Sequence, residues 1–206
     1  MSDTRLPIPP PIPTGRPRAG AWSRAAEPAG ADPEGPRPDS SEPFFAGHVI
    51  GLTIEQWGEH EREIVEHPGA VAVLPIDTEG NVVFVRQLRV ATRRHLLELP
   101  AGGLKPGEEP LACAQRELAE ETGLTGGRWR HLTTFWTTPG FCRELMWLYV
   151  AEDVAPGERW TEPDVDEEIE VVRVPIDEVA ALLPEIGDLK TLAGLLLWLR
   201  QRDSAA

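Results

Sequence analysis

Cysteine is scarce in this chain of 206 residues, and its scarcity excludes two kinds of cross-link. The two cysteines, Cys113 and Cys142, belong neither to a Cys-x-x-Cys pair nor to a Cys/His spacing typical of zinc ligands. We therefore expect neither a disulfide framework nor a structural zinc site. A hydrophobic core has to hold the fold together, and a chain of this length is large enough to form one.

Positive charge is also in short supply. The chain has 20 lysine and arginine residues against 34 aspartate and glutamate residues, which gives a formal net charge of -14. Nucleic acids and anionic membranes bind basic surfaces, so neither is an expected partner. An apolar run of about 18 residues and a basic-then-apolar leader are both missing, so we expect neither a membrane span nor a secretion signal. The cytoplasm is the expected location.

Proline, in contrast, is abundant and unevenly placed. Of the 21 prolines, 11 lie in residues 1–43, where glycine, arginine and alanine separate them and apolar periodicity is almost absent. Such a segment cannot bury enough surface to offset its ordering entropy, so we predict a disordered tail. Its stretch LPIPPPIP, Leu6–Pro13, is alternatively a polyproline II ligand for an aromatic groove. The folded domain is expected over residues 44–206.

The hydrophobic patterns of residues 44–206 predict a mixed domain. Alternation of Ile50, Leu52 and Ile54, followed by a second short segment, predicts a small antiparallel strand pair in residues 47–67, ahead of a catalytic core in residues 68–206. The strands predicted in this core are residues 70–76, 82–88, 128–138, 144–153 and 168–176.

Two helices are predicted to close the chain, a short one over residues 176–183 and a longer one over residues 188–202 with Asp188 as N-cap. Leucines at helical spacing define the expected buried stripe of the longer helix: Leu189, Leu192, Leu196 and Leu199. Strands on both sides of a central helix, with two helices at the end, predict an α/β/α sandwich built on a mixed sheet.

The central helix lies within residues 102–124, GGLKPGEEPLACAQRELAEETGL. It is predicted to begin between residues 108 and 110, because proline is favoured in the first turn, and to stop at Gly123. Its expected buried stripe is Leu111, Ala114 and Leu118.

Three carboxylates share one face of this helix. Glu117, Glu120 and Glu121 stand at positions i, i+3 and i+4, so their charges repel one another within one turn. One interpretation is a solvated acidic face, which is the usual fate of a charge run. The other is a site for a hard cation such as Mg²⁺ or Mn²⁺, which prefers oxygen ligands and offsets the repulsion.

The spacing of the fixed residues in this stretch resembles the Nudix box. Its defining positions are occupied by Gly102, Glu108, the triplet Arg116-Glu117-Leu118, the pair Glu120-Glu121 and the pair Gly123-Leu124. So many fixed positions at fixed spacing favour the cation site over the solvated face. The resemblance extends more loosely over residues 47–200, and the fold that it implies is the same α/β/α sandwich.

The resemblance implies roles for the residues of the box. Glu117 and Glu121 become the primary metal ligands, and Glu120 becomes a further ligand. The carbonyl oxygen of Ala101 completes the coordination of Mg²⁺ or, alternatively, of Mn²⁺. Arg116 orients these carboxylates from behind through a bidentate pair.

Three features outside the box resemble the ADP-ribose pyrophosphatase subgroup of this family. They are the run Glu98-Leu99-Pro100-Ala101-Gly102, Pro139 at 15 residues beyond the box, and the strand Arg86-Gln87-Leu88-Arg89, in which Leu88 replaces the usual tyrosine. The resemblance places Glu98, Arg89 and Pro139 at the substrate. Arg89 is the candidate for a diphosphate or ribose contact, and the alternative is an ordinary surface ion pair.

The resemblance also places the general base outside the box, in an acidic loop before the last strand. This loop offers Asp164, Asp166, Glu167 and Glu168, and Glu167 is favoured because the base of the subgroup is a glutamate just before that strand. A loop rich in proline and glycine suits a movable lid. Alternatively, the loop is only a solvated connector, and the base lies elsewhere.

Trp57, in the predicted N-terminal strand pair, is the candidate for stacking on adenine. Members of this subgroup stack the base with residues from that region, often across a homodimer interface formed by an exchanged N-terminal sheet. The resemblance therefore implies a homodimer.

These features predict a Mg²⁺-dependent hydrolase that cleaves the pyrophosphate of ADP-ribose, to AMP and ribose 5-phosphate, or of a related nucleoside diphosphate sugar. Alternatives are hydrolysis of another nucleoside diphosphate derivative, a ligand-sensing domain without catalysis, and isopentenyl diphosphate isomerase chemistry, for which Cys142 is the one candidate cysteine. The intact box argues against the sensing domain.

Overall fold

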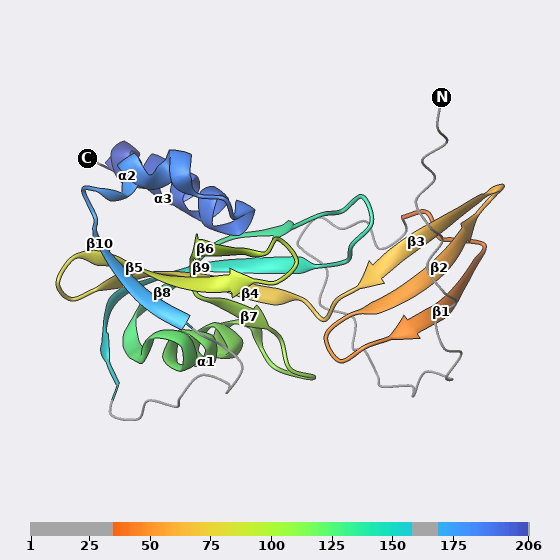
Figure 1. Cartoon of the computed structure of the whole chain (residues 1–206), viewed down its shortest axis with the longest axis horizontal. Helices are drawn as coiled ribbons and strands as arrows, with labels where there is room; N and C mark the ends of the chain where they lie inside the picture. Colours follow the sequence, from red (N-terminus) through yellow and green to blue (C-terminus); the bar gives the residue numbers. More distant parts are fainter. Residues whose placement is uncertain (1–34, 158–168, 206) are drawn as a thin grey trace.

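The structure is a computed structural model that describes residues 35–157 and 169–205. It consists of a large layered core and a small separate sheet, which lie at opposite ends of the molecule (Figure 1). In chain order the elements are β1 Ser40–Ala46, β2 Gly51–Trp57, β3 His60–Glu66, β4 Ala70–Asp77, β5 Asn81–Arg89, β6 Arg94–Glu98, β7 Ala101–Gly103, α1 Pro110–Thr122, β8 Leu124–Trp136, β9 Leu145–Pro156, β10 Ile169–Pro175, α2 Val179–Leu182, the 3-10 turn η1 Leu183–Glu185 and α3 Leu189–Ala205.

The core is the α/β/α sandwich that the sequence predicts. Its mixed sheet has the order β10-β5-β4-β9-β8, with β4 and β9 parallel and the other pairs antiparallel. Helix α1 covers one face of the sheet, and α2 and α3 cover the other face (Figure 1). No helix in the described ranges 35–157 and 169–205 is long and apolar enough to cross a membrane.

Two short strands enter this sheet where its central strands diverge. β4 and β5 pair with each other at Ile76 and Val82. Away from this pair, β5 pairs with β6 and β4 pairs with β7. The chain passes from β6 to β7 through Leu99 and Pro100, and the carbonyl oxygen of Pro100 accepts a hydrogen bond of 2.9 Å from the backbone N–H of Val73. The segment that leads into the Nudix box is thereby built into the centre of the sheet.

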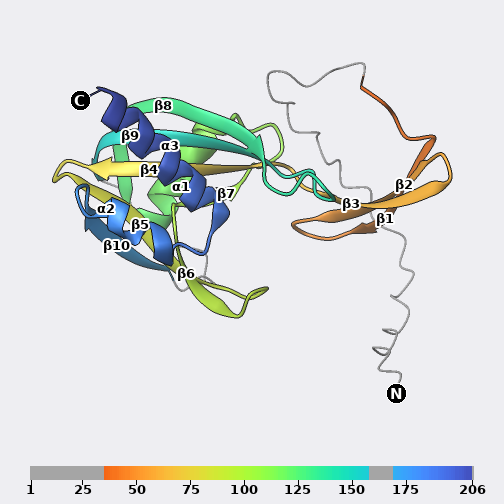
Figure 2. The same ribbon diagram turned by 90° about the horizontal axis from the view of Figure 1, so that it is seen from above.

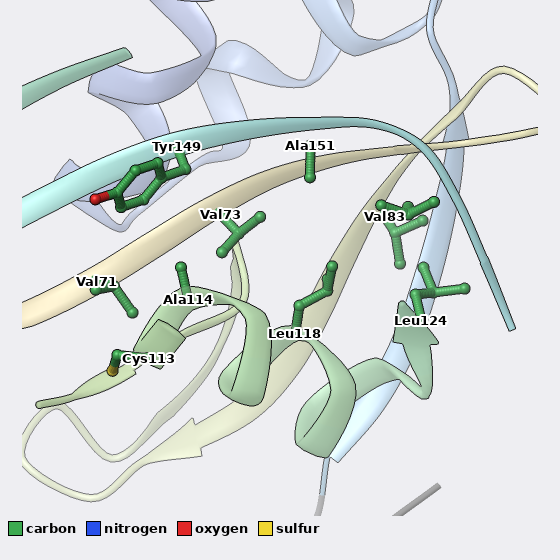
Figure 3. Packing of buried hydrophobic residues seen from close by; sticks show 10 residues of the cluster. Val71, Val73, Val83, Cys113, Ala114, Leu118, Leu124, Tyr149 and Ala151 are labelled. Carbon is green, nitrogen blue, oxygen red and sulfur yellow. The ribbon is translucent and has the colours of Figure 1, made fainter. Parts of the chain in front are cut away.

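The core on the α1 face is formed by small and branched side chains. Ala114 and Leu118 of α1 point toward the sheet and, with Cys113, form one buried cluster with Val71 and Val73 of β4 (Figure 3). These side chains are fully buried, which confirms Ala114 and Leu118 of the predicted stripe.

Leu111 is an exception to that stripe, because 40% of it is exposed. In the first turn of α1 the residue that faces the sheet is Cys113, whose thiol donates to the carbonyl oxygen of Gly103. The prediction for Leu111 was wrong because apolar spacing alone does not show where a helix first meets its sheet.

Helix α3 packs on the opposite face through a stripe that differs from the predicted one. Leu195, Trp198 and the predicted Leu199 are buried, and the predicted Leu192 is half-buried against the same cluster. The predicted members Leu189 and Leu196 are exposed. Residues 192–199 are apolar on several sides of the helix, so helical periodicity did not identify the face that meets the sheet.

The small sheet has three antiparallel strands in the order β1-β2-β3, one more than the predicted pair. Its first strand begins at Ser40, inside the segment expected to be tail, and pairs with β2 from Ser40 and Gln56 onward. Pro43 lies where the register of this edge strand shifts, a position that tolerates a residue without an N–H donor. The sequence SSEPFFA lacks alternation, and pairing with β2 makes it a strand.

The buried side of β2 is polar, which reverses the expectation for this strand. Thr53 and Glu55 are buried, whereas Leu52 and Ile54 are half-buried and Ile50 is 42% exposed. The prediction assumed that the apolar side of the strand would face the core. Glu55 is buried because an arginine of the core reaches it.

That arginine, Arg143, is part of the joint between the small sheet and the core. Its guanidinium donates to Glu55 at 2.6 Å and also to Glu66. Nearby, the backbone of Val65 exchanges hydrogen bonds with Phe141 and Arg143. The turn between β8 and β9 therefore holds β3 by a short run of backbone pairing, and both views show the small sheet otherwise clear of the core (Figures 1 and 2).

The N-terminus of α3 is tied to the connection between β6 and β7. The carboxylate of Asp188 accepts the backbone N–H of Thr191 at 2.9 Å, which confirms Asp188 as the N-cap. The hydroxyl of Thr191 donates to the same carboxylate and accepts the backbone N–H of Leu99 at 2.8 Å. Thr191 is fully buried, so this N–H has no access to water.

We predict that Thr191→Val lowers the free energy of unfolding by about 1 to 3 kcal/mol, because it leaves the buried N–H of Leu99 without its acceptor while keeping the side-chain volume. Urea unfolding followed by circular dichroism measures the change. Thr191→Ser, which keeps the hydroxyl, should retain most of the stability. Equal urea midpoints for the valine variant and the wild type would contradict the prediction.

Candidate active site

Helix α1 presents the acidic residues of the candidate site, and its ends follow the sequence signals. Pro110 is its first residue, Glu109 precedes it in an extended conformation, and Gly123 ends it with a left-handed φ of 71°. Glu117, Glu120 and Glu121 therefore share one face of a regular helix within one turn, as predicted.

Arg116 organises the carboxylates on the helix and on the preceding loop. Its Nε and Nη2 donate to the two oxygens of Glu108, at 2.8 and 2.9 Å. Its Nη1 donates to one oxygen of Glu117 at 2.6 Å and to one oxygen of Glu120 at 2.8 Å. One guanidinium thus fixes three carboxylates, and its bonds use a single oxygen of Glu117 and of Glu120.

These contacts shift the ionisation of the loop carboxyl. The hydrogen bonds from Arg116 lower the pKa of Glu108 from 4.5 to about 2, and a backbone N–H from Lys105 contributes in the same direction. The same bonds raise the pKa of Arg116. Glu108 is therefore a firmly charged anchor that closes the loop onto the helix.

Glu117 lies against the backbone of the turn that enters the box. A Cβ atom placed on Gly102 would lie 2.0 Å from the carboxyl carbon of Glu117, so only glycine permits this approach. Burial raises the pKa of Glu117, and the nearby charge of Glu120 adds to the rise, while the bond from Arg116 opposes it. A carboxylate that is costly to ionise here gains from a cation beside it.

Glu121, one helical turn after Glu117, meets the same Ala101-Gly102 turn. Its Oε2 accepts the backbone N–H of Ala101 at 3.0 Å, and the side chain is largely buried. The carboxylates of Glu117 and Glu121 therefore both border the Ala101-Gly102 backbone.

The donor set at this turn consists of oxygen atoms, which fits a hard divalent cation. Within residues 35–157 and 169–205, no group of three or more histidine, cysteine, aspartate or glutamate side chains is arranged to hold a metal ion. Glu117 and Glu120 turn one oxygen each to Arg116 instead. The oxygen donors therefore fit a divalent cation by their chemistry, although the described carboxylates are not arranged around one.

A second charged cluster lies beside this turn, at the junction of β5, β6 and α3. Nε and Nη2 of Arg89 donate to the two oxygens of Glu98 at 2.8 and 2.6 Å, and Lys190 of α3 also contacts Glu98. The hydrogen bonds that Arg89 donates to Glu98 raise the pKa of Arg89, and the charges of Glu121 and Asp188 raise it further. The side chain of Arg89 is 40% exposed and is paired with a buried carboxylate that also contacts Lys190.

The structure does not bring every predicted residue to this place. Trp57 ends β2 in the small sheet, and its indole N–H donates to Glu55 at 3.0 Å. Pro139 is exposed in the turn between β8 and β9. Glu167, the favoured base, lies outside the described residues, as do the other three acids of its loop.

Cys142 lies in the same turn as Pro139, next to the small sheet. It bridges to Val65 of β3, and burial raises the pKa of its thiol. The cysteine that isomerase chemistry would need is thus built into the joint with β3.

Two features of the site were not recognised in the sequence. Lys190 gave no local signal, because its contact with Glu98 joins residues 92 positions apart. The role of Gly102 had a signal in the Gly-Gly pair of the box, but its steric partner, Glu117, is identified only by the packing of α1 on the turn.

Comparison with known proteins agrees with this geometry. The profile of the NUDIX domain family matches residues 66–194. The chain is 41% identical to the ADP-ribose pyrophosphatase of Bacillus subtilis, over 74% of this chain and 86% of that protein. It is 38% identical to the methanol dehydrogenase activator of Bacillus methanolicus, again over 74% of this chain and 86% of that protein.

A solved structure shares the fold. The crystal structure of an ADP compounds hydrolase superposes with a TM-score of 0.67 at 23% identity, covering 81% of this chain and 95% of that one. The chain belongs to the Nudix family. Nudix hydrolases generally use divalent metal ions, so the oxygen donors at the Ala101-Gly102 turn are consistent with the chemistry of the family.

The anchoring of Glu108 predicts a pH dependence. Its pKa in the folded chain is about 2, below the ordinary 4.5, so its bond to Arg116 stabilises the fold above pH 4.5. This contribution is lost as the pH falls from about 4.5 to about 2, where the folded form also takes up the proton. We expect Glu108→Gln to be less stable than the wild type at pH 7, with the difference narrowing below pH about 4.5.

Urea midpoints measured from pH 7 down to pH 3 check this expectation. Glu109→Gln, which removes the same charge from the exposed neighbouring residue, is the matched control. A difference between Glu108→Gln and the wild type that stays constant across this range would contradict it.

Proposed function

We propose that this protein is a metal-dependent hydrolase that cleaves the pyrophosphate of ADP-ribose or of a related nucleoside diphosphate sugar. The observation that carries the proposal is the pair of carboxylates, Glu117 and Glu121, packed against the Ala101-Gly102 turn of an intact Nudix box. The relative named as an ADP-ribose pyrophosphatase supports the substrate class. Water attacks one phosphorus, the bridging P–O bond breaks, and ADP-ribose yields AMP and ribose 5-phosphate.

Glu117 and Glu121 are the proposed primary ligands of the divalent cation, with Glu120 and the carbonyl oxygen of Ala101 as further ligands. When bound, the cation neutralises charge on the diphosphate and lowers the pKa of a water molecule. Mg²⁺ is the proposed ion, and Mn²⁺ is the alternative. The bonds from Arg116 leave each of Glu117 and Glu120 a second oxygen for such an ion, since a carboxylate has two.

Arg116 acts on the site by orienting Glu117 and Glu120 rather than by touching the substrate. Arg89 is the proposed contact to the diphosphate or ribose. Its bidentate bond to Glu98 uses Nε and Nη2, and Nη1 lies on the other edge of the guanidinium. The general base stays a prediction, with Glu167 favoured.

A homodimer is the proposed assembly, and the composition of the small sheet supports it. Large apolar side chains on or beside its strands are exposed in the single chain: Phe44, Phe45, Val49 and Ile50. A second copy would cover apolar surface that water now contacts. Such a dimer would allow Trp57 of one copy to lie at the site of the other copy. Adenine stacking on Trp57 and a cytoplasmic location stay predictions from the sequence.

A second candidate is hydrolysis of a different nucleoside diphosphate derivative. The relative named as a methanol dehydrogenase activator is nearly as similar to this chain as the named pyrophosphatase, so similarity alone leaves the group beyond the diphosphate open. A sensing domain without turnover is disfavoured by the intact box carboxylates.

The decisive experiment is phosphate-coupled turnover with Mg²⁺ or with chelator. The panel comprises ADP-ribose, other nucleoside diphosphate sugars, dinucleoside polyphosphates, NADH and nucleoside triphosphates. We expect metal-dependent hydrolysis with preference for ADP-ribose. Metal-dependent hydrolysis of another compound would keep the reaction and replace the substrate, whereas binding without turnover would support the sensing domain.

The approach of Glu117 to Gly102 gives a matched pair of variants. Gly102→Ala puts a Cβ into the space of the Glu117 carboxylate, so we expect turnover to fall by about a hundredfold or more. A Cβ on Gly103 meets only the carbonyl oxygen of Gly69, at 4.0 Å, so Gly103→Ala should stay within about twofold of the wild type.

The same pair separates loss of the site from loss of the fold. Thermal unfolding should give a cooperative transition for both variants. Equal activity of Gly102→Ala and Gly103→Ala would refute a catalytic position for the Glu117 carboxylate at this turn.

A further inference from the structure

We propose that Lys190, at the start of α3, is a positioning residue for substrate binding, which acts through Glu98 to fix the guanidinium of Arg89. The inference rests on the proposed function, because it takes Arg89 as a substrate contact. It adds a residue from the opposite layer of the sandwich to a site that the box and its preceding strand otherwise form.

Glu98 is the centre of the network. Its side chain is 1% exposed, and the side chains of Arg89 and Lys190 both pair with its carboxylate. Arg89 takes both oxygens, with Nε on Oε1 at 2.8 Å and Nη2 on Oε2 at 2.6 Å, and Lys190 Nζ also contacts Oε2. A carboxylate held on both oxygens from two directions has little freedom to rotate, and neither does the arginine bonded to it.

Lys190 is itself held in place. Its Nζ lies 3.0 Å from Oδ1 of Asp188, and its side chain is 10% exposed. The other oxygen of Asp188 accepts the backbone N–H and the hydroxyl of Thr191. Two cations and two carboxylates thus balance in charge, and the cap of α3 fixes the lysine as well as the helix.

The network is connected through the backbone to the Ala101-Gly102 turn. Thr191 binds the backbone N–H of Leu99, and two residues later the N–H of Ala101 binds Glu121. At the outer end, 40% of the Arg89 side chain is exposed, so its guanidinium extends from a buried anchor toward solvent. This is the geometry of a preorganised anion contact whose support comes from behind.

Removal of Lys190 should loosen the anchor without touching the carboxylates of the box. Glu98 would keep Arg89 as its one cation and could turn with it, so the arginine would meet the substrate with a less defined orientation. A contact that forms in both the ground state and the transition state changes KM more than kcat. A residue that only stabilises the fold would change neither once the protein is folded.

The test is the steady-state kinetics of ADP-ribose hydrolysis with Mg²⁺. We expect Lys190→Met to raise KM by roughly tenfold while kcat stays within about twofold, a size typical of residues that share one charged network. Lys190→Arg should restore much of the loss. Arg200→Met removes one positive charge from the exposed side of the same helix and should keep the wild-type KM.

A double-mutant cycle shows whether Lys190 acts through Glu98. In a Glu98→Gln background, adding Lys190→Met should leave KM unchanged within about twofold, because the intermediary has already been lost. Comparing Glu98→Gln with the double variant also tests the inference if Lys190→Met alone fails to fold. Neither of these two proteins carries a buried Glu98 charge that needs a cationic partner. A further rise of KM in the double variant would overturn the inference.

The outcomes for inference and function are distinct. If the wild type hydrolyses ADP-ribose and Lys190→Met has the same KM as the wild type, the inference alone is overturned. Absence of turnover by the wild type on every compound of the panel would overturn the proposed function and this inference with it.

Discussion

The candidate site depends on one close contact, the carboxyl group of Glu117 against the backbone of Gly102. The contact requires a residue without a side chain, a helix that crosses directly over the turn, and small buried residues such as Ala114 beneath that helix. Glu121, one helical turn further along α1, then accepts the backbone N–H of Ala101. Because both carboxylates are fixed by the packing of α1, the layered core is what gives the acidic face its chemistry.

Two arginines make this concentration of negative charge tolerable in a protein with a net charge of -14. Arg116 holds three carboxylates from the side of the helix, and Arg89 holds the buried Glu98 on the neighbouring strand. Their roles differ, because Arg116 is turned inward to the carboxylates of the box, whereas Arg89 extends outward. Bidentate bonds suit both roles, since a planar guanidinium fixes a carboxylate in orientation as well as in position.

The small sheet illustrates how far the sequence pattern can be trusted. Alternation in residues 50–54 correctly indicates a strand, yet its buried residues are Thr53 and Glu55. Periodicity reports which residues share a side, and the partner decides which side is buried. Here the partner is Arg143, a charged residue from a distant turn, and the apolar side is left for another surface. Helix α3 shows the same limit, because apolar residues on several sides did not identify its contact face.

The sequence alone determined the longer strands and the helices of the core, the Nudix box with its helix ends, the acidic face of α1 and the family resemblance, because each depends on local spacing and on the conformational preferences of glycine and proline. Only the tertiary structure decided which residues support that face. The steric pairing of Gly102 with Glu117, the reach of Arg143 into the small sheet and the contact of Lys190 with Glu98 each join segments distant in the chain. Such contacts follow from how layers pack, and no local pattern encodes them.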